Sequence, residues 1–256
     1  MSQEWEQVRD WLSGQRSKRQ PYVSQRGSIL SLHFNEDSTQ SEMDVNEPDK
    51  LVLAYTRAMM SFLLLYPAPK HIAMIGLGGG SLAKYCYRYL PQSDITVVEI
   101  DADVIALRDD FLMPPDDLRL HVILGDGAAW VHETETQPEV LVVDGFDAHG
   151  LPESLSSQQF YDACFNMLSV SGVLVVNLWS GYPNYDTYVA RIRTSFADRV
   201  LIVDAEDKAN KIVLAMKGEA WPPAAATLRH QAQLLSPRHT LNFQAKANRL
   251  IQALPR

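Results

Sequence analysis

Cysteine, positive charge and long apolar runs are all scarce in this chain of 256 residues. Its two cysteines, Cys86 and Cys164, form no CxxC motif, which argues against a disulfide framework or a zinc knuckle and fits a reducing compartment. Acidic residues outnumber Lys and Arg by 31 to 23, and this disfavours a nucleic-acid partner. No apolar run approaches the roughly 20 residues of a membrane-spanning helix. We therefore expect a cytoplasmic protein with no membrane partner.

The order of apolar and polar residues predicts an α/β fold, since strand-like apolar runs alternate with helical patterns over most of the chain. We expect residues 1–46 to hold an N-terminal helix and a small β-hairpin unit. Residues 47–256 are expected to form one Rossmann-like, nucleoside-binding catalytic domain, with a mostly parallel sheet that helices cover on both faces. Its last two strands, at 200–203 and 211–216, have no helix between them, which predicts an antiparallel addition at the sheet edge.

The other elements of the larger domain follow from the same patterns. We expect strands at 71–75, 95–100, 118–124, 140–143 and 173–178. We expect helices at 47–66, 82–90, 102–111, 128–133, 157–168, 185–196 and 227–254. The first helix is predicted to start at Glu47 because a proline and an acid follow it, as in many first helical turns.

A glycine cluster joins the first strand of this domain to a helix. Gly76, Gly78 and Gly80 fall between the apolar run and the helical pattern. Glycine lets the backbone turn tightly and approach a ligand, and the helix N-terminus directs free N–H groups at that ligand. A dinucleotide-binding loop would need its third glycine at Ser81, so an NAD oxidoreductase is disfavoured. The spacing is typical of domains that bind a sulfonium nucleoside, although a tight turn alone would also explain it.

Two acidic residues after the next strands could bind the rest of a nucleoside. Glu99 ends its strand 23 residues after Gly76, where a carboxylate can accept hydrogen bonds from ribose hydroxyls, and Asp101 is the alternative. Asp126, which precedes Gly127, could accept a hydrogen bond from the adenine amine. Asp126 could also cap the helix that follows, and the two roles are compatible.

The pair Asp144 and Asp147 follows a central strand of the predicted sheet. Ligands of open α/β sheets bind at the carboxyl ends of the strands, so these carboxylates are candidates for chemistry, with turn formation as the alternative. The histidines show no metal-ligand spacing, and the GxSxG motif of serine hydrolases is missing. We therefore expect no metal.

The motifs GLGGGS, VVEID, GDG and VVDGFD, followed by GLPESLSSQQFY, resemble those of the polyamine aminopropyltransferases, typified by spermidine synthase. The resemblance covers roughly residues 38–180. It implies a seven-stranded sheet of the S-adenosylmethionine-dependent methyltransferase type and a homodimer. It also implies transfer of an aminopropyl group from decarboxylated S-adenosylmethionine to a small-molecule polyamine acceptor.

The resemblance also implies roles for individual residues. Gln40 would bind the methionine-derived end of the nucleoside, Glu99 its ribose and Asp126 its adenine. Asp144 would be the catalytic base, while Tyr55 and Asp147 would bind the amine substrate. The remaining residues expected at the nucleoside are Gly76, Gly78, Gly80, Ser81 and Gly127.

Three departures from the family pattern keep other functions open. The family's acid after the glycines, which contacts the aminopropyl amine of the donor, is Ser81 here. The family's His/Gln-Glu pair is Thr56 and Arg57 here, and its late Tyr-Pro loop has no match in residues 204–208. A neutral Ser81 favours a methyltransferase that uses ordinary S-adenosylmethionine. A non-catalytic nucleoside-binding relic is the third possibility.

Overall fold

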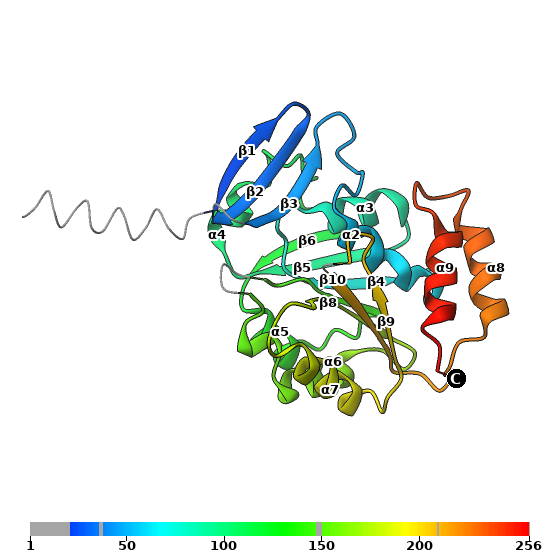
Figure 1. The fold of residues 1–256 in the computed structure, drawn as a ribbon. Helices are drawn as coiled ribbons and strands as arrows, with labels where there is room; N and C mark the ends of the chain where they lie inside the picture. The colour runs from blue at the N-terminus through cyan, green and yellow to red at the C-terminus, as the bar shows by residue number, and fades with distance from the viewer. Residues whose placement is uncertain (1–20, 36–37, 147–149, 209, 256) are drawn as a thin grey trace, which may run out of the picture.

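The computed structural model describes residues 21–35, 38–146, 150–208 and 210–255 (Figure 1). Its N-terminal part is a three-stranded antiparallel sheet in the order β1-β2-β3. These strands are β1 (Tyr22–Arg26), β2 (Ile29–Asn35) and β3 (Ser38–Asp44). The helix expected before them lies outside the described residues, and the domain boundary after residue 46 stays a prediction.

The larger sheet of the described chain has seven strands in the order β6-β5-β4-β7-β8-β10-β9. Neighbouring strands are parallel from β6 to β8, whereas β10 is antiparallel to both β8 and β9. This confirms the mostly parallel sheet and the antiparallel addition. The strands are β4 (His71–Ile75), β5 (Asp94–Glu99), β6 (Leu120–Leu124), β7 (Val140–Val143), β8 (Val173–Trp179), β9 (Val200–Asp204) and β10 (Asn210–Met216).

Helices cover both faces of this sheet. Those of the described residues are α2 (Ala54–Met59), η1 (Met60–Leu64), α3 (Ser81–Tyr89), α4 (Ala102–Ala106), α5 (Gly127–Glu133), η2 (Glu153–Leu155), α6 (Gln158–Met167), α7 (Tyr185–Ser195), α8 (Ala225–Leu235) and α9 (Phe243–Gln252). In Figure 1, α5, α6 and α7 lie on one side of the sheet, and α3, α8 and α9 lie on the other. Alternate residues of β4 enter the two resulting cores: Ile72 and Met74 face one, Ala73 and Ile75 the other.

Three expected helices have other bounds in the structure. The helix expected from residue 47 begins at Ala54, because Glu47 forms a β-bridge with Asp44 and the chain turns there. The helix expected at 102–111 ends at Ala106. The helix expected at 227–254 is two helices, since the first ends ahead of Pro237 and the side chain of Asn242 caps the second.

Among the described residues, none of the helices is both long enough and apolar enough to cross a bilayer.

Candidate active site

A cavity of about 740 Å³ lies at the carboxyl ends of β4, β5, β7 and β8. The first helical segment α2, the strand β3 and the turn between β9 and β10 complete its wall. Parallel strands of one sheet end at the same edge, so motifs far apart in the sequence meet there. The volume is in the range of small-molecule sites, and we treat this cavity as the candidate active site.

The glycine loop lies between β4 and α3, and its residues Gly76 and Gly78 line the cavity, whereas Gly80 does not. Gly76, Gly78 and Gly80 all have φ in the left-handed region, at +93°, +52° and +69°. A Cβ atom on Gly76 would lie 2.3 Å from the carbonyl oxygen of Asp144. Glycine is therefore required at residue 76 both by backbone conformation and by the close approach of the chain after β7.

Glu99 lies at the end of β5 and is buried in the cavity wall. Its Oε2 accepts a hydrogen bond from the Leu77 N–H at 2.7 Å, and its Oε1 accepts one from the Asp101 N–H at 3.0 Å. A carboxylate has about four acceptor positions, so Glu99 retains capacity for ligand hydroxyls. The alternative, Asp101, caps α4 and is not part of the cavity wall.

Asp126 and Gly127 line the cavity where α5 begins. The Oδ1 of Asp126 accepts hydrogen bonds from the N–H groups of Ala128 at 2.7 Å and Ala129 at 3.3 Å. The helix-capping role is therefore present in the structure. The side chain is also exposed, and the second carboxylate oxygen has no protein donor among the hydrogen bonds of the described residues. The predicted contact with adenine is compatible with this arrangement.

Asp144 directly follows β7 and lines the cavity. Its Oδ1 accepts a hydrogen bond from Nδ2 of Asn177 on β8 at 2.9 Å. Desolvation raises the pKa of Asp144 to about 6, although the hydrogen bond from Asn177 and the nearby hydroxyl of Tyr55 act in the opposite direction. At neutral pH such a carboxylate is mostly ionised and can still accept a proton.

Tyr55 connects Asp144 to the strand β3. Its hydroxyl donates to the carbonyl oxygen of Gln40 at 3.2 Å. Burial, and then the negative charge of Asp144, raise the pKa of Tyr55 well above its usual value. Gln40, Tyr55 and Asp144 all line the cavity, so the structure brings together three of the residues expected at the substrates.

Ser81 is buried at the start of α3 and also lines the cavity. Its hydroxyl lies 3.4 Å from Oγ of Ser41 and donates to the carbonyl oxygen of Glu42 at 3.3 Å. The residue after the glycine loop thus links α3 to β3. Ser81 carries no charge, unlike the acid that the family pattern has at this position.

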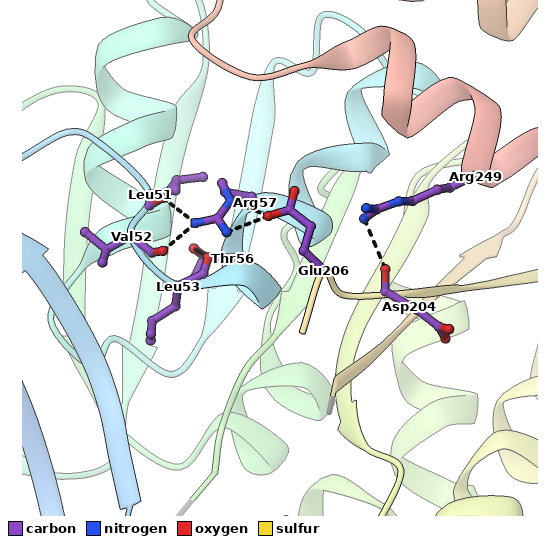
Figure 2. Close-up of polar contacts among 8 residues, drawn as sticks. All are labelled: Leu51, Val52, Leu53, Thr56, Arg57, Asp204, Glu206 and Arg249. Atoms are coloured by element: carbon purple, nitrogen blue, oxygen red, sulfur yellow. Dashed lines mark hydrogen bonds and ion pairs between the residues drawn. The ribbon is translucent and has the colours of Figure 1, made fainter. Parts of the chain in front are cut away.

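Arg57 follows two cavity-lining residues but does not itself line the cavity. Figure 2 shows its guanidinium between the carbonyl oxygens of Leu51 and Val52 on one side and the carboxylate of Glu206 on the other. Arg57 is one of the departures from the family pattern, and its positive charge would be an objection to an amine-binding site if it faced the cavity. The structure removes that objection, because the positive charge is directed at Glu206 and not at the cavity.

Some cavity residues were not expected from the sequence. They are Ser41, Asn177, Asp207 and Asn210, among others. One signal was available for Asn177, which is a polar residue inside an otherwise apolar strand. Asp147, the expected amine anchor, lies outside the described residues.

The cavity wall carries charge of one sign. Its described residues include the carboxylates of Glu99, Asp126, Asp144 and Asp207 and no lysine, arginine or histidine. Within the described ranges, no group of three or more His, Cys, Asp or Glu side chains is placed to hold a metal ion. The site is suited to a positively charged organic ligand.

The matching family model and the curated relatives are of the spermidine synthase type, whereas the solved structures of similar fold also include a human methyltransferase-like protein, with a TM-score of 0.66 at 22% identity. The spermine/spermidine synthase domain family matches residues 52–195. A polyamine aminopropyltransferase from Neisseria meningitidis serogroup A is 38% identical over 223 residues, which are 86% of this chain and 85% of that protein. One from Chromobacterium violaceum is 37% identical over 231 residues, 90% of this chain and 88% of that protein. The crystal structure of a probable spermidine synthase from Corynebacterium glutamicum has a TM-score of 0.69 at 17% identity and covers 92% of both chains.

Proposed function

This chain belongs to the spermine/spermidine synthase family, and on that premise we propose that it is a transferase that moves an aminopropyl group from decarboxylated S-adenosylmethionine to a polyamine acceptor. We propose the decarboxylated form of the donor because the relatives that match over most of both chains are named polyamine aminopropyltransferases. Methyl transfer and a non-catalytic relic have no such support.

The observation that carries the proposal is the charge of the cavity. Four carboxylates and no basic side chain line its described wall. Both proposed reactants are cations, since the donor has a sulfonium and an ammonium group and the acceptor is a polyamine. A wall of this kind stabilises both of them and raises their local concentration.

Asp144 is proposed as the catalytic base. A primary amine with a pKa of about 10.4, by analogy with lysine, is protonated at neutral pH and has no lone pair for attack. Asp144 would accept one proton from this ammonium group. The freed nitrogen would then form a bond to the propyl carbon next to the sulfur while the carbon–sulfur bond breaks. The bonding electron pair goes to sulfur, which leaves in neutral methylthioadenosine.

The nucleoside is proposed to lie along the carboxyl ends of β4, β5 and β6. Glu99 would hold the ribose and Asp126 the adenine, with Gly76, Gly78, Gly80 and Gly127 allowing the close backbone approach. Gln40 and Ser81 would contact the end derived from methionine, and Tyr55 would contact the amine. Holding both reactants in line supplies much of the rate acceleration in such displacements.

The identity of the leaving product tests this proposal. Purified protein is incubated with 1,4-diaminobutane and either decarboxylated or ordinary S-adenosylmethionine, and the nucleosides are separated by chromatography. Aminopropyl transfer releases methylthioadenosine from the decarboxylated donor only. Release of S-adenosylhomocysteine from the ordinary donor would instead establish a methyltransferase. If neither product forms although a nucleoside still binds at micromolar concentration, the result would favour the non-catalytic nucleoside-binding relic.

The assembly and location of the protein also stay proposals. We propose a homodimer in the cytoplasm with no nucleic-acid partner, as expected from the sequence. Asp147 is retained as a predicted contact of the amine.

A further inference from the structure

The ion pair between Arg57 and Glu206 joins helix α2 to the turn between β9 and β10 (Figure 2). Nε and Nη2 of Arg57 donate to Oε2 of Glu206 at 3.0 Å and 2.5 Å. Two such hydrogen bonds to one carboxylate also orient the guanidinium. The pair is partly exposed, so its own contribution to the free energy of unfolding is small. Its importance lies in the two segments that it connects.

The first of these segments leads to the Tyr55 hydroxyl. Nη1 of Arg57 donates to the carbonyl oxygen of Leu51 at 3.1 Å and to that of Val52, so the guanidinium also holds the chain just before α2. Tyr55 lies on α2, two residues before Arg57, and its hydroxyl is close enough to Asp144 for each group to act on the pKa of the other. The position of α2 therefore determines where this hydroxyl lies.

The second segment leads to the same carboxylate from the other side. The turn that carries Glu206 is closed by the Ala205 N–H, which donates to the carbonyl oxygen of Asn210 at 2.9 Å. Nδ2 of Asn210 donates to Oδ1 of Asn177 at 2.9 Å, and Nδ2 of Asn177 donates to Oδ1 of Asp144 at 2.9 Å. The position of the turn therefore determines the direction of the Asn177 amide.

These contacts form a closed ring around the proposed base. One half of the ring runs through α2 and Tyr55, and the other half runs through the turn, Asn210 and Asn177. The ion pair is the outer link between the two halves. Neither Arg57 nor Glu206 lines the cavity, so both act on the base through other residues and not on a substrate.

We propose that Arg57 and Glu206 are positioning residues for Asp144. Their ion pair holds α2 and the turn together, and this keeps the Tyr55 hydroxyl and the Asn177 amide at the carboxylate. The inference rests on the proposed aminopropyl transfer, in which this carboxylate accepts the proton of the amine.

The first test measures the pKa of Asp144 by carbon NMR of protein labelled in its aspartate carboxyl groups, with Asp144→Asn to assign the signal. Glu206→Ala releases the turn, so Asn177 becomes a poorer donor to the ionised carboxylate. We expect the pKa of Asp144 to rise by about 0.5–1 in this variant. A pKa that stays level or falls in Glu206→Ala would overturn the inference.

A direct effect of charge would have the opposite sign. Loss of the negative charge of Glu206 favours the ionised form of a nearby acid, and so does the unpaired charge of Arg57. Glu206→Gln is the matched variant, because it loses the same charge but keeps an oxygen that can accept from Arg57. We expect the pKa of Asp144 in Glu206→Gln to be at or slightly below that of the wild type.

The other charged groups around the ring are the same in the wild type and in both variants. Lys246 and Arg249 act on Glu206, and Asp204 and Lys211 form an ion pair beside the turn. The carboxylates that line the cavity together with Asp144 are those of Glu99, Asp126 and Asp207. A difference between Glu206→Ala and Glu206→Gln therefore reports on position.

The second test is kinetic. In Glu206→Ala we expect kcat to fall about three- to tenfold, because the base is less well placed. The dissociation constant of methylthioadenosine should stay within about twofold and the melting temperature should change little. Asp198→Asn, which removes a charge from an exposed ion pair ahead of β9, should match the wild type. A purely structural role would lower the melting temperature and the nucleoside affinity together with kcat, and that outcome would overturn the inference.

A double-mutant cycle tests the ring itself. Asn210→Ala opens the ring at a second point, and a ring that is already open loses less at the next break. The fold losses of kcat in Glu206→Ala and Asn210→Ala should therefore not multiply in the double variant. Losses that do multiply would show that the two residues act independently, against the inference.

The NMR titration needs no turnover, and this separates two kinds of failure. If the wild type releases no methylthioadenosine while the pKa of Asp144 rises in Glu206→Ala, the proposed function fails and the positioning by the ion pair stands. If the wild type reacts while Glu206→Ala and Glu206→Gln give the same pKa, only this inference is overturned. If there is neither turnover nor a rise in the pKa, both fall.

Discussion

Asn177 donates a hydrogen bond to Asp144 at 2.9 Å, from one parallel strand to the next. Its own carbonyl oxygen accepts from Asn210, so the direction of the amide is determined by two partners. Asn177 is buried, and a buried amide needs such partners. The contact stabilises the ionised form of Asp144 in a place where desolvation favours the neutral form. This one amide thus contributes to the protonation state of the proposed base.

Replacing Asp144 by asparagine should abolish catalysis and spare nucleoside binding. The variant keeps the shape of the side chain but cannot accept the proton of the amine, so we expect kcat to fall by about 10²–10⁴-fold. Calorimetry with methylthioadenosine should give a dissociation constant within about threefold of the wild type. Full turnover in the variant would remove Asp144 from the role of base.

The pH profile should follow the pKa of Asp144. Because its pKa is raised to about 6, the fraction of ionised base falls as pH drops through that value. We expect kcat/KM for the acceptor to decline below about pH 6. Donor binding, measured by calorimetry over the same range, should not follow this decline. A profile that is level down to pH 4.5 would contradict the assignment.

Removal of the Asn177 amide should move that decline to higher pH. In Asn177→Leu, the ionised carboxylate loses a donor, so the pKa of Asp144 rises further and less base is ionised at neutral pH. Activity at pH 8.5 should recover more than activity at pH 6.5. An unchanged midpoint, in a variant with native circular dichroism, would show that Asn177 does not act on the base.

The sequence predicted the strands well and the helix ends less well, for a physical reason. Buried parallel strands are short apolar runs, and β7 was expected at its observed bounds. Helix ends depend on local partners that periodicity does not reveal. The bridge between Asp44 and Glu47 moves the start of α2 to a later residue than expected. The apolar pattern that predicted one terminal helix continues across Pro237, where the structure has a break between α8 and α9.

Some residues of the candidate site were predicted from the sequence, and others were missed. Glu99, the last residue of β5, and Asp144, directly after β7, were found because strand ends meet at one edge of the sheet. Asn177 and Asn210 were missed because only the antiparallel pairing of β8 with β10 brings them together. The direction in which the Arg57 side chain points could not be predicted either, since its partner Glu206 is 149 residues away in the sequence.

Alanine at residue 76 should destabilise the protein far more than alanine at residue 27. Both glycines have positive φ, which costs an alanine about 1–2 kcal/mol. A Cβ on Gly27 meets nothing within 4 Å, whereas one on Gly76 meets backbone atoms of Asp144. Overpacking adds about 1–3 kcal/mol to the cost at Gly76. Urea unfolding of the two variants gives the comparison, and equal losses of stability would refute the steric argument.

The buried Lys84 should make stability rise with pH in the alkaline range. Its ammonium group, on α3, donates to the Phe111 carbonyl at 2.6 Å, and burial lowers its pKa to about 8, with Asp49 acting in the opposite direction. Between pH 8 and 10.5 the unfolded chain therefore binds more protons at this residue than the folded chain does, and the free energy of unfolding increases with pH.

Comparison with Lys84→Met isolates this effect, because other groups that titrate at high pH are shared. From pH 7 to pH 10, the wild type should gain on the order of 2 kcal/mol relative to that variant. Lys70→Met, at an exposed lysine, should show no such difference. If urea unfolding gives parallel pH curves for the wild type and Lys84→Met, then Lys84 stays protonated in the fold, and its hydrogen bond to Phe111 outweighs the cost of burying the charge.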